Sequence, residues 1–443
     1  MMRKKAIVKA TPSLFDDLES SDGEAEISGE GKDTSSTFVG NLGLPVHRWF
    51  RYSAGFSAAW VRDVIEREKK NGRTRILDPF VGSGTVTLEG EASQVEAIGV
   101  ESHPFVARIA RAKLNWRESP KAFSTYALSI LSDAKKEKVE QEDYPALMGK
   151  CFPPETFTRL EAIRCVWGRQ ADGSPLSELT WLALSAILRE CSPVGTAQWQ
   201  YVLPNKSKAR VIDPFPAFEA KVRLFSADMT QRQREPAGPK ALLYSEDARE
   251  CQSVPAGWAD LVITSPPYAN NYDYADATRL EMTFFREIAG WGCLQKTVRK
   301  HLIRSCTQHV SPLTKQTDSI VREAVLAPIF GELQETCRAL ADAREGHGGK
   351  KPYHTMVAAY FKDMAEVWLA LRRVTATGAI VCFVVGDSAP YGVYVPVDRW
   401  LGDLAVAAGF KSYNFEKTRD RNIKWKNRKH RVPLHEGRLW VQG

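Results

Sequence analysis

A run of five residues, Thr264-Ser265-Pro266-Pro267-Tyr268, brings together groups that can hold a flat heterocycle with an exocyclic amino group. Two consecutive prolines remove two backbone donors, so this segment cannot continue a sheet and stays a stiff, extended loop. Tyr268 offers an aromatic face for stacking, and the Ser265 hydroxyl and the nearby carbonyls can accept N–H bonds. A rigid Pro-Pro turn that only ends a strand is the alternative that these residues alone leave open.

A glycine-rich turn lies further upstream, between two strand-like runs. The predicted order is a strand over 75–80, a turn over 81–84, a helix over 85–92 and a strand over 97–101. This is a βαβ unit whose first turn lets the backbone approach a ligand, because glycine has no Cβ. Glu101 follows Gly84 by 17 residues, which is suitable for binding ribose hydroxyls from the tip of the second strand.

Features that are missing from this turn narrow the ligand. A dinucleotide-binding turn has a third glycine where this chain has Thr87, and no Gly-Lys-Ser/Thr follows as in a nucleoside-triphosphate loop. The pattern therefore favours an adenosine-bearing ligand without a pyrophosphate, of which S-adenosylmethionine is the common one. Asp247, after a third strand-like run over 241–244, can accept a hydrogen bond from an adenine amino group or cap a helix.

The composition indicates a globular protein of one large domain with insertions, or of two domains. The chain has 443 residues, of which 43% are hydrophobic and 26% charged. Its longest apolar run, 378–385, is too short to cross a membrane and predicts a buried strand. Lys9 interrupts the apolar character of the first ten residues, which indicates a cytoplasmic rather than an exported protein. Eight cysteines without a Cys-x-x-Cys pair indicate buried thiols of a reducing compartment and no metal site.

Charge is unevenly distributed along the chain. Residues 16–33 carry eight acids and predict a disordered acidic leader, whereas residues 417–431 carry eight Lys or Arg. The basic segment is either a solvated surface hairpin or an edge that contacts phosphates. The net charge of +8 fits a polyanionic partner. The expected phosphate contacts are Lys424, Lys426, Arg428 and Lys429, with Arg304 as a further candidate.

These segments together resemble the DNA amino-methyltransferases, and among them the N4-cytosine group, whose catalytic loop is Ser-Pro-Pro-Tyr rather than Asp-Pro-Pro-Tyr. The family's first cofactor motif is similar to residues 78–85, and its ribose-binding acid is similar to Glu101. Its adenine-side acid is similar to Asp247, and its catalytic loop to residues 265–268. The segment 47–57 resembles the part of the family that binds the cofactor tail.

The resemblance touches roughly residues 45–105 and 240–415 and implies a set of site residues. The implied catalytic residues are Ser265, Pro266, Pro267 and Tyr268. The implied cofactor-binding residues are Asp78, Phe80, Gly82, Ser83, Gly84, Thr85, Glu101, Asp247, Phe56 and Ser57. The implied fold is a Rossmann-like class I methyltransferase, with a mostly parallel seven-stranded sheet and helical insertions.

The resemblance also implies a reaction and its partners. A methyl group of S-adenosylmethionine would be transferred to the N4 amino group of a cytosine flipped out of duplex DNA. Cognate restriction or phage-defence proteins would be functional partners, and a membrane would not. Two alternatives stay open: an N6-adenine DNA or guanine-N2 RNA methyltransferase, and a catalytically silent nucleic-acid-binding protein on the same scaffold.

The expected division of the chain follows from these matches. It consists of a disordered acidic leader over 1–40, cofactor motifs over 41–105, a mostly helical insertion over 106–240 and the rest of the methyltransferase domain over 241–443. The last part includes a helical insert over about 294–360 and the basic segment. The 106–240 insertion serves either target recognition or as a purely structural helical cap.

Overall fold

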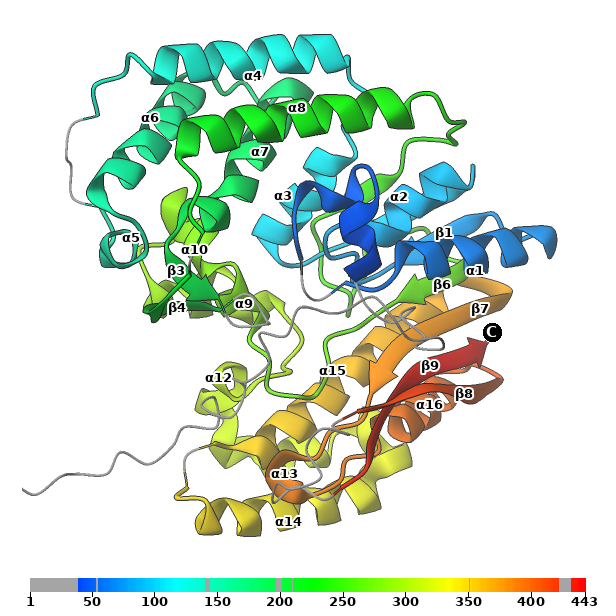
Figure 1. Ribbon diagram of the computed structural model, residues 1–443. Coiled ribbons are helices and arrows are strands. Elements are labelled where there is room, and N and C mark those ends of the chain that lie inside the picture. The colour runs from blue at the N-terminus through cyan, green and yellow to red at the C-terminus, as the bar shows by residue number, and fades with distance from the viewer. Residues whose placement is uncertain are drawn as a thin grey trace, which may run out of the picture. The chain divides into compact units, whose positions relative to one another are not determined.

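The computed structural model describes residues 39–52, 55–139, 144–196, 201–208, 210–349, 351–421 and 432–443 (Figure 1). The acidic leader expected at residues 1–40 lies almost wholly outside this description. So do the four lysines and arginines of the basic segment that we expect to contact phosphates. No helix in the described ranges is long and apolar enough to span a membrane.

A seven-stranded sheet forms the centre of the described fold. Its strands are β1 (Arg75–Asp78), β2 (Glu96–Val100), β5 (Leu242–Tyr244), β6 (Ala259–Thr264), β7 (Thr375–Gly386), β8 (Ser412–Arg421) and β9 (Leu434–Gln442). They lie in the order β5-β2-β1-β6-β7-β9-β8. In this order, the adjacent strands β5, β2, β1, β6 and β7 pair in parallel. Strand β9 pairs antiparallel with both β7 and β8. The expected fold class, a mostly parallel seven-stranded sheet of the methyltransferase type, is thereby confirmed.

The strand order creates a switch point between β1 and β6. From β1 the chain moves outward to β2 and β5, and then returns to the other side of β1 as β6. The register pairs Ile76 with Leu261 and Leu77 with Val262. In open α/β sheets, ligands bind outside the carboxyl ends of the strands at such a point. The loops after β1 and β6 therefore leave the sheet side by side.

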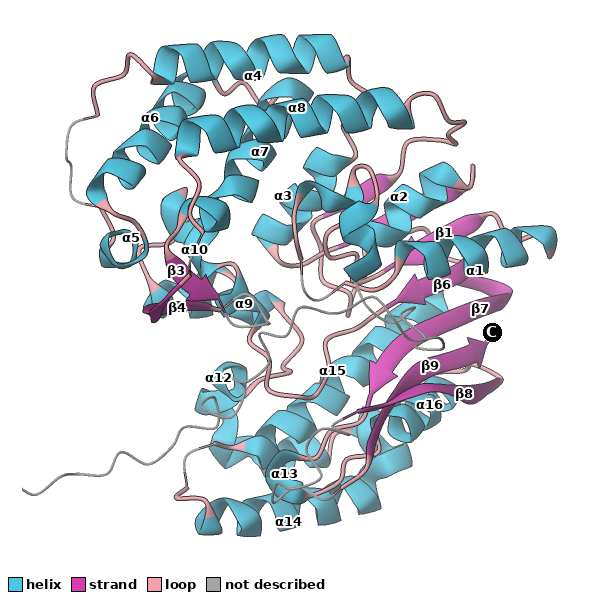
Figure 2. Ribbon diagram, in the orientation of Figure 1, coloured by secondary structure: helices cyan, strands magenta, loops and turns pink. Residues whose placement is uncertain are grey.

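Helices cover both faces of the sheet, as Figure 2 shows. Ile76 packs on one face together with α1 (Ala58–Lys70) and α2 (Thr85–Ala92). Leu77 packs on the other face with α15 (Tyr353–Val374) and α16 (Val397–Ala407). Successive strand residues point to opposite faces, so a sheet covered on both sides has continuous apolar strands, like the run that begins at Gly378. That run lies within β7.

A second group of elements covers much of the segment that we expect to be inserted. Its helices are α4 (Pro120–Ala134), α5 (Ala146–Cys151), α6 (Pro154–Gln170), α7 (Pro175–Cys191) and α8 (Pro214–Arg232), preceded by α3 (Pro104–Lys113). A small antiparallel hairpin, β3 (Val194–Thr196) and β4 (Val202–Ser207), lies between α7 and α8. Ser119, Ser174 and Asp213 cap α4, α7 and α8, each followed by a proline suited to the first helical position. In Figure 1, α4, α6, α7 and α8 lie together.

A run of short helices follows β6 and leads to α15. They are α9 (Tyr274–Ala277), α10 (Arg279–Phe284), α11 (Leu294–Thr297), α12 (Thr307–Val310) and α13 (Thr317–Val321), and then the longer α14 (Phe330–Gly346). The helices from α12 to α14 pack against α15. Through these contacts, the chain that follows the Pro-Pro loop is held against α15, which packs on the central sheet.

Candidate active site

A buried hydrogen bond ties the glycine turn to the Pro-Pro loop at their starts. Thr264 at the end of β6 donates from Oγ1 to Oδ1 of Asp78 at the end of β1, at 2.6 Å. The same oxygen accepts the Phe80 backbone N–H at 3.0 Å. Burial raises the pKa of Asp78 to about 7, against the opposing effect of these hydrogen bonds. The two motifs singled out in the sequence therefore share one edge of the sheet.

The glycine turn has the backbone that its composition predicts. Gly82 and Gly84 have φ values of 53° and 92°, in the left-handed region that favours glycine. Gly84 is the residue from which α2 begins. A Cβ at Gly82 would lie 3.3 Å from the ring of Tyr52, so the turn closely approaches that aromatic side chain. Ser83 and Thr85 are buried within the turn, and Phe80 is half-buried beside it.

Glu101 reaches from the end of β2 to this turn. Its Oε2 accepts the Gly82 N–H and its Oε1 accepts the His103 N–H, both at 2.9 Å. Burial raises the pKa of Glu101 to about 7, and hydrogen bonds from backbone N–H groups act in the opposite direction. The carboxylate thus lies directly against the backbone of the turn at Gly82.

Tyr52 is a residue of this site that sequence reasoning did not single out. It is buried, and its pKa lies well above the ordinary value because of burial and then the nearby Glu101 carboxylate. Its position in the segment 47–57, which resembles the cofactor-tail segment, was the available signal. Ser53 and Ala54 in the same segment lie outside the described residues.

The Pro-Pro loop holds its polar groups in a defined arrangement. The Ser265 hydroxyl donates to the Val384 carbonyl at 3.3 Å, so its oxygen can act toward a further partner only as an acceptor. Pro266 is buried, while Pro267 and Tyr268 are partly exposed. Burial raises the pKa of Tyr268 above its ordinary value, so its ring stays neutral.

The neighbouring end of β7 holds the loop from its other side. Ser388 donates to the Ala269 carbonyl at 2.5 Å. The buried Asp387 contacts His435 Nδ1 at 2.7 Å and accepts the Tyr394 hydroxyl at 3.0 Å. The carboxyl ends of β6 and β7 are therefore joined above the sheet.

Asp247 lies after β5, but its carboxylate is already engaged. Both of its oxygens accept from Arg249 Nε, at 2.9 and 3.1 Å. Arg249 also pairs with the buried Asp363 at 3.1 Å, and Arg304 pairs with Asp363 as well. No helix begins at Asp247 in the described residues, so the helix-cap alternative is wrong. The adenine contact of Asp247 and the DNA contact of Arg304 stay predictions, with both groups held in one ion-pair network.

Phe56 and Ser57 have structural contacts in this structure. Phe56 is buried in the core between α1 and the sheet, with its ring edge-on to Trp60 at 5.8 Å. The Ser57 hydroxyl accepts the Trp60 N–H at 3.3 Å and thereby caps α1. Their roles toward a cofactor stay predictions.

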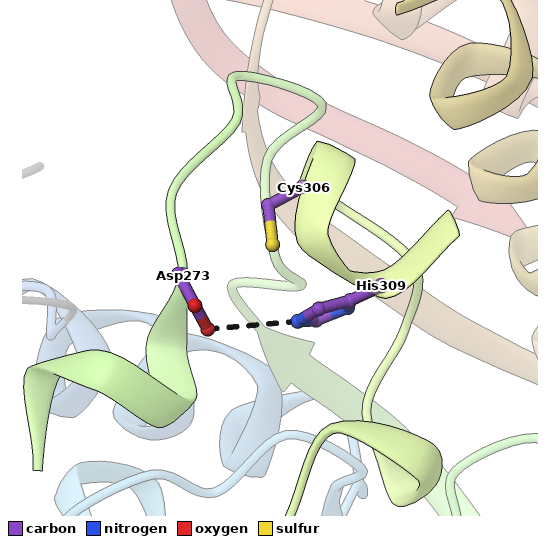
Figure 3. A group of neighbouring side chains, drawn as sticks. All are labelled: Asp273, Cys306 and His309. Atoms are coloured by element: carbon purple, nitrogen blue, oxygen red, sulfur yellow. Dashed lines mark ion pairs between the residues drawn. The ribbon is translucent and has the colours of Figure 1, made fainter. Parts of the chain in front are cut away.

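A cluster of Asp273, Cys306 and His309 lies in the chain that follows the Pro-Pro loop, at the start of α9 and at α12 (Figure 3). His309 Nε2 lies 3.7 Å from Asp273 Oδ1, and Arg299 Nη2 donates to the other oxygen at 2.5 Å. Burial alone would raise the pKa of Asp273, but its bonds with His309 and Arg299 outweigh burial and hold the pKa at about 2. The Arg299 guanidinium already pairs with the Asp273 carboxylate. The cluster therefore forms a buried ion-paired contact between the start of α9 and α12.

Sequence similarity relates the chain to type II methyltransferases. No family model matches the chain. It is 26% identical over 424 residues to the type II methyltransferase M.BsoBI of Geobacillus stearothermophilus, covering 85% of this chain and 80% of that protein. It is 25% identical over 415 residues to the type II methyltransferase M.AvaI of a Nostoc species, covering 86% and 82%. A shorter match of 22% over 244 residues is to the type II methyltransferase M.MvaI of Kocuria varians, covering 51% and 53%.

The sheet order defines an α/β protein whose fold is consistent with a methyltransferase. The matches to M.BsoBI and M.AvaI make the chain a distant homologue of type II DNA methyltransferases.

Proposed function

We propose that the protein is a DNA methyltransferase of a restriction–modification system that transfers a methyl group from S-adenosylmethionine to the N4 amino group of a flipped cytosine. The observation that carries this proposal is the bond between Thr264 and Asp78, which brings the glycine turn and the Pro-Pro loop to one edge of the sheet. The type II methyltransferases that the chain resembles support the broader part of the proposal. The resemblance of the loop to the Ser-Pro-Pro-Tyr group supports the choice of cytosine N4.

The residues at the glycine turn fit an adenosine-bearing ligand. Glu101 presents carboxylate oxygens that can accept hydrogen bonds from ribose hydroxyls beside the backbone of Gly82. Asp78 Oδ2 is buried without a hydrogen-bond partner among the described residues, so it can accept a further donor such as an ammonium group. When bound here, S-adenosylmethionine supplies a methyl group on a positively charged sulfur. Asp247 and the segment that contains Phe56 complete the proposed pocket.

The Pro-Pro loop would prepare the amino group for methylation. An exocyclic amino nitrogen is a poor nucleophile because its lone pair is delocalised into the ring. Ser265 Oγ and the Pro266 carbonyl can each accept one N–H of the amino group, which favours a pyramidal nitrogen with an exposed lone pair. The new N–C bond would form as the methyl–sulfur bond breaks, with neutral S-adenosylhomocysteine as the leaving group, and one amino proton would pass to water. Positioning and electrostatics carry the rate, without a covalent intermediate.

Tyr268 would hold the flipped base. Extruding a base from the duplex costs a few kcal/mol, and stacking of the base on an aromatic ring offsets about 1–3 kcal/mol of this cost. The partly exposed ring of Tyr268 supplies that surface within the loop. Methylation at cytosine C5 would require a thiolate in a Pro-Cys loop, and no cysteine of this chain follows a proline.

The remaining parts of the chain have proposed roles around this centre. Residues 41–105 and 241–443 would form the catalytic domain, and the helices and the hairpin within 106–240 would contribute to recognising the target sequence. The basic segment, with Lys424 and Arg428, would contact phosphates. A restriction endonuclease that cuts the same sequence would be the functional partner.

Nucleoside analysis tests the proposed product. DNA from cells that express the protein is digested to nucleosides, and N4-methylcytosine is separated from N6-methyladenine by chromatography with mass detection. The proposal predicts N4-methylcytosine, and none in cells that express Glu101→Ala at an equal level. N6-methyladenine as the product would establish the adenine alternative. If the protein binds DNA but no methylated base is found, the result would favour a catalytically silent nucleic-acid-binding protein.

A further inference from the structure

The last residue of β8 lies at the same edge of the sheet as the Pro-Pro loop. Strand β9 is antiparallel to both β7 and β8, so β8 runs in the same direction as β7. The carboxyl end of β8 therefore lies on the ligand-binding side, and Arg421 is the residue at that end. This position gives an arginine side chain access to the site from the strand farthest from the glycine turn.

Arg421 contacts the aromatic ring of the proposed catalytic loop. Its guanidinium carbon lies 5.6 Å from the centre of the Tyr268 ring, within the range of a cation–π interaction. Nη1 donates to the Asp387 backbone carbonyl at 2.8 Å. The side chain runs across Gly386, where a Cβ would lie 2.7 Å from Nη1 and 3.4 Å from Cδ. A glycine at the end of β7 thus allows Arg421 to lie against Tyr268.

The charge of Arg421 has no carboxylate partner within the part of the chain that the structure describes. Other arginines at this side of the sheet do have one: Arg249 pairs with Asp363, and Arg419 pairs with Glu436. A guanidinium has five N–H donors, and the hydrogen bond of Arg421 to described protein groups is made from Nη1. Among the described residues, its remaining donors are therefore available to a ligand that binds next to the guanidinium on the Tyr268 ring.

We propose that Arg421 is a specificity-determining residue that reads the flipped base held on Tyr268. Next to its amino group, cytosine carries two adjacent acceptors, the ring nitrogen N3 and the carbonyl oxygen O2. Adenine carries a single acceptor, N1, followed by a C–H group. A guanidinium with two neighbouring N–H donors matches the cytosine edge and leaves one donor unmatched on adenine. This inference rests on the proposed function and assigns the choice of base to a residue outside the Pro-Pro loop.

An exchange of single atoms in the base tests this contact. Duplex DNA carries, at the target position mapped by sequencing methylated DNA, either cytosine or 3-deazacytosine, which lacks the N3 acceptor. The affinity of each duplex is measured in the presence of S-adenosylhomocysteine for the wild type, Arg421→Ala and Lys417→Ala. Lys417 lies in the same strand and forms an exposed ion pair with Asp420, so its variant removes one positive charge away from Tyr268.

The wild type and Lys417→Ala are expected to bind the 3-deazacytosine duplex about tenfold more weakly than the cytosine duplex. In Arg421→Ala this difference is expected to vanish, while S-adenosylhomocysteine affinity and the thermal unfolding midpoint stay unchanged. An equal difference in all three proteins overturns the proposal. If Arg421→Ala instead lowers only the salt dependence of binding, Arg421 contacts a phosphate and the proposal is wrong. Failure of the proposed function is recognised separately, because the wild-type product would then be a base other than N4-methylcytosine.

Discussion

Thr264 and Asp78 are 186 residues apart in sequence, yet a hydrogen bond of 2.6 Å joins their side chains in the buried space between β1 and β6. Each residue is the last of its strand, and the loop that follows each strand carries one half of the proposed chemistry. The bond therefore fixes where the glycine turn and the Pro-Pro loop begin relative to each other. Removing it tests the framework without touching either loop.

Thr264→Val is expected to lower the free energy of unfolding by about 1–3 kcal/mol, because the buried Asp78 oxygen loses its side-chain donor while the shape of residue 264 is kept. Urea denaturation measures this change. Thr264→Ser retains the hydroxyl and serves as the matched control, with a smaller loss. If the valine variant proves as stable as the wild type, the hydrogen bond does not hold the two loops together.

The affinity for S-adenosylmethionine is expected to rise with pH through about 7. Burial raises the pKa of both Glu101 and Asp78 to about 7 in the free protein, and both are proposed to accept hydrogen bonds from the ligand as carboxylates. Binding thus selects the ionised forms and releases the protons that the free protein holds below this pH. Affinity accordingly falls as the pH is lowered below 7 and levels off above about 8.

Glu101→Gln removes one of the two carboxyl groups that are expected to release a proton on binding. Calorimetric titration in buffers of different ionisation enthalpy measures the number of protons released on binding. At pH 6 this number is expected to fall by about one in the variant, and the affinity to fall at pH 8, where the carboxylate is ionised in the wild type. Equal proton release in both proteins would remove Glu101 from the ligand site.

Tyr268→Ala is expected to lower turnover of DNA by roughly 5- to 150-fold, which corresponds to the loss of about 1–3 kcal/mol of stacking with the base. Cofactor affinity should stay near the wild-type value, because the ring belongs to the loop after β6 and not to the glycine turn. Tyr268→Phe keeps the ring and should keep most of the activity. Methyl transfer to a DNA duplex, measured with labelled S-adenosylmethionine, checks both variants. Full activity of the alanine variant would refute the stacking role.

The buried pair of Arg299 and Asp273 is expected to support the chain that follows the Pro-Pro loop. The two side chains are 2% and 7% exposed, and Asp273 also caps α9. Arg299→Met removes the guanidinium partner of the buried Asp273 carboxylate and should cost about 3–5 kcal/mol of stability. Adding Asp273→Asn removes that charge while keeping a capping residue, so the double variant should regain part of the loss. Additive losses in the double variant would show that the two residues do not act as a pair.

The local parts of the site were predictable from sequence, and its long-range contacts were not. The helix expected over 85–92 is α2 with the same bounds, since a glycine turn and an apolar strand define it locally. The strand expected over 75–80 ends at Asp78, just before Pro79, which has no N–H for a sheet. The apolar residues just ahead of the Pro-Pro loop form β6.

The contacts that sequence reasoning missed join residues far apart in the chain. Arg249 reaches Asp363, and Arg421 lies over Tyr268, across more than 100 residues in each case. Neither pair leaves a periodic pattern or a local motif, because the fold alone brings them together. Asp247 illustrates the consequence. Its place after β5 could be inferred, but its pairing with an arginine two residues later, itself held by Asp363, could not.

The central claim is that the glycine turn and the Pro-Pro loop enclose a single methyl-transfer site. An experimental structure of the protein with S-adenosylhomocysteine bound tests it most directly. The account predicts the ribose hydroxyls on Glu101, the backbone of Gly82 against the ligand, and the sulfur facing the loop of Ser265 and Tyr268. A ligand bound elsewhere, or one whose sulfur points away from that loop, would contradict the account.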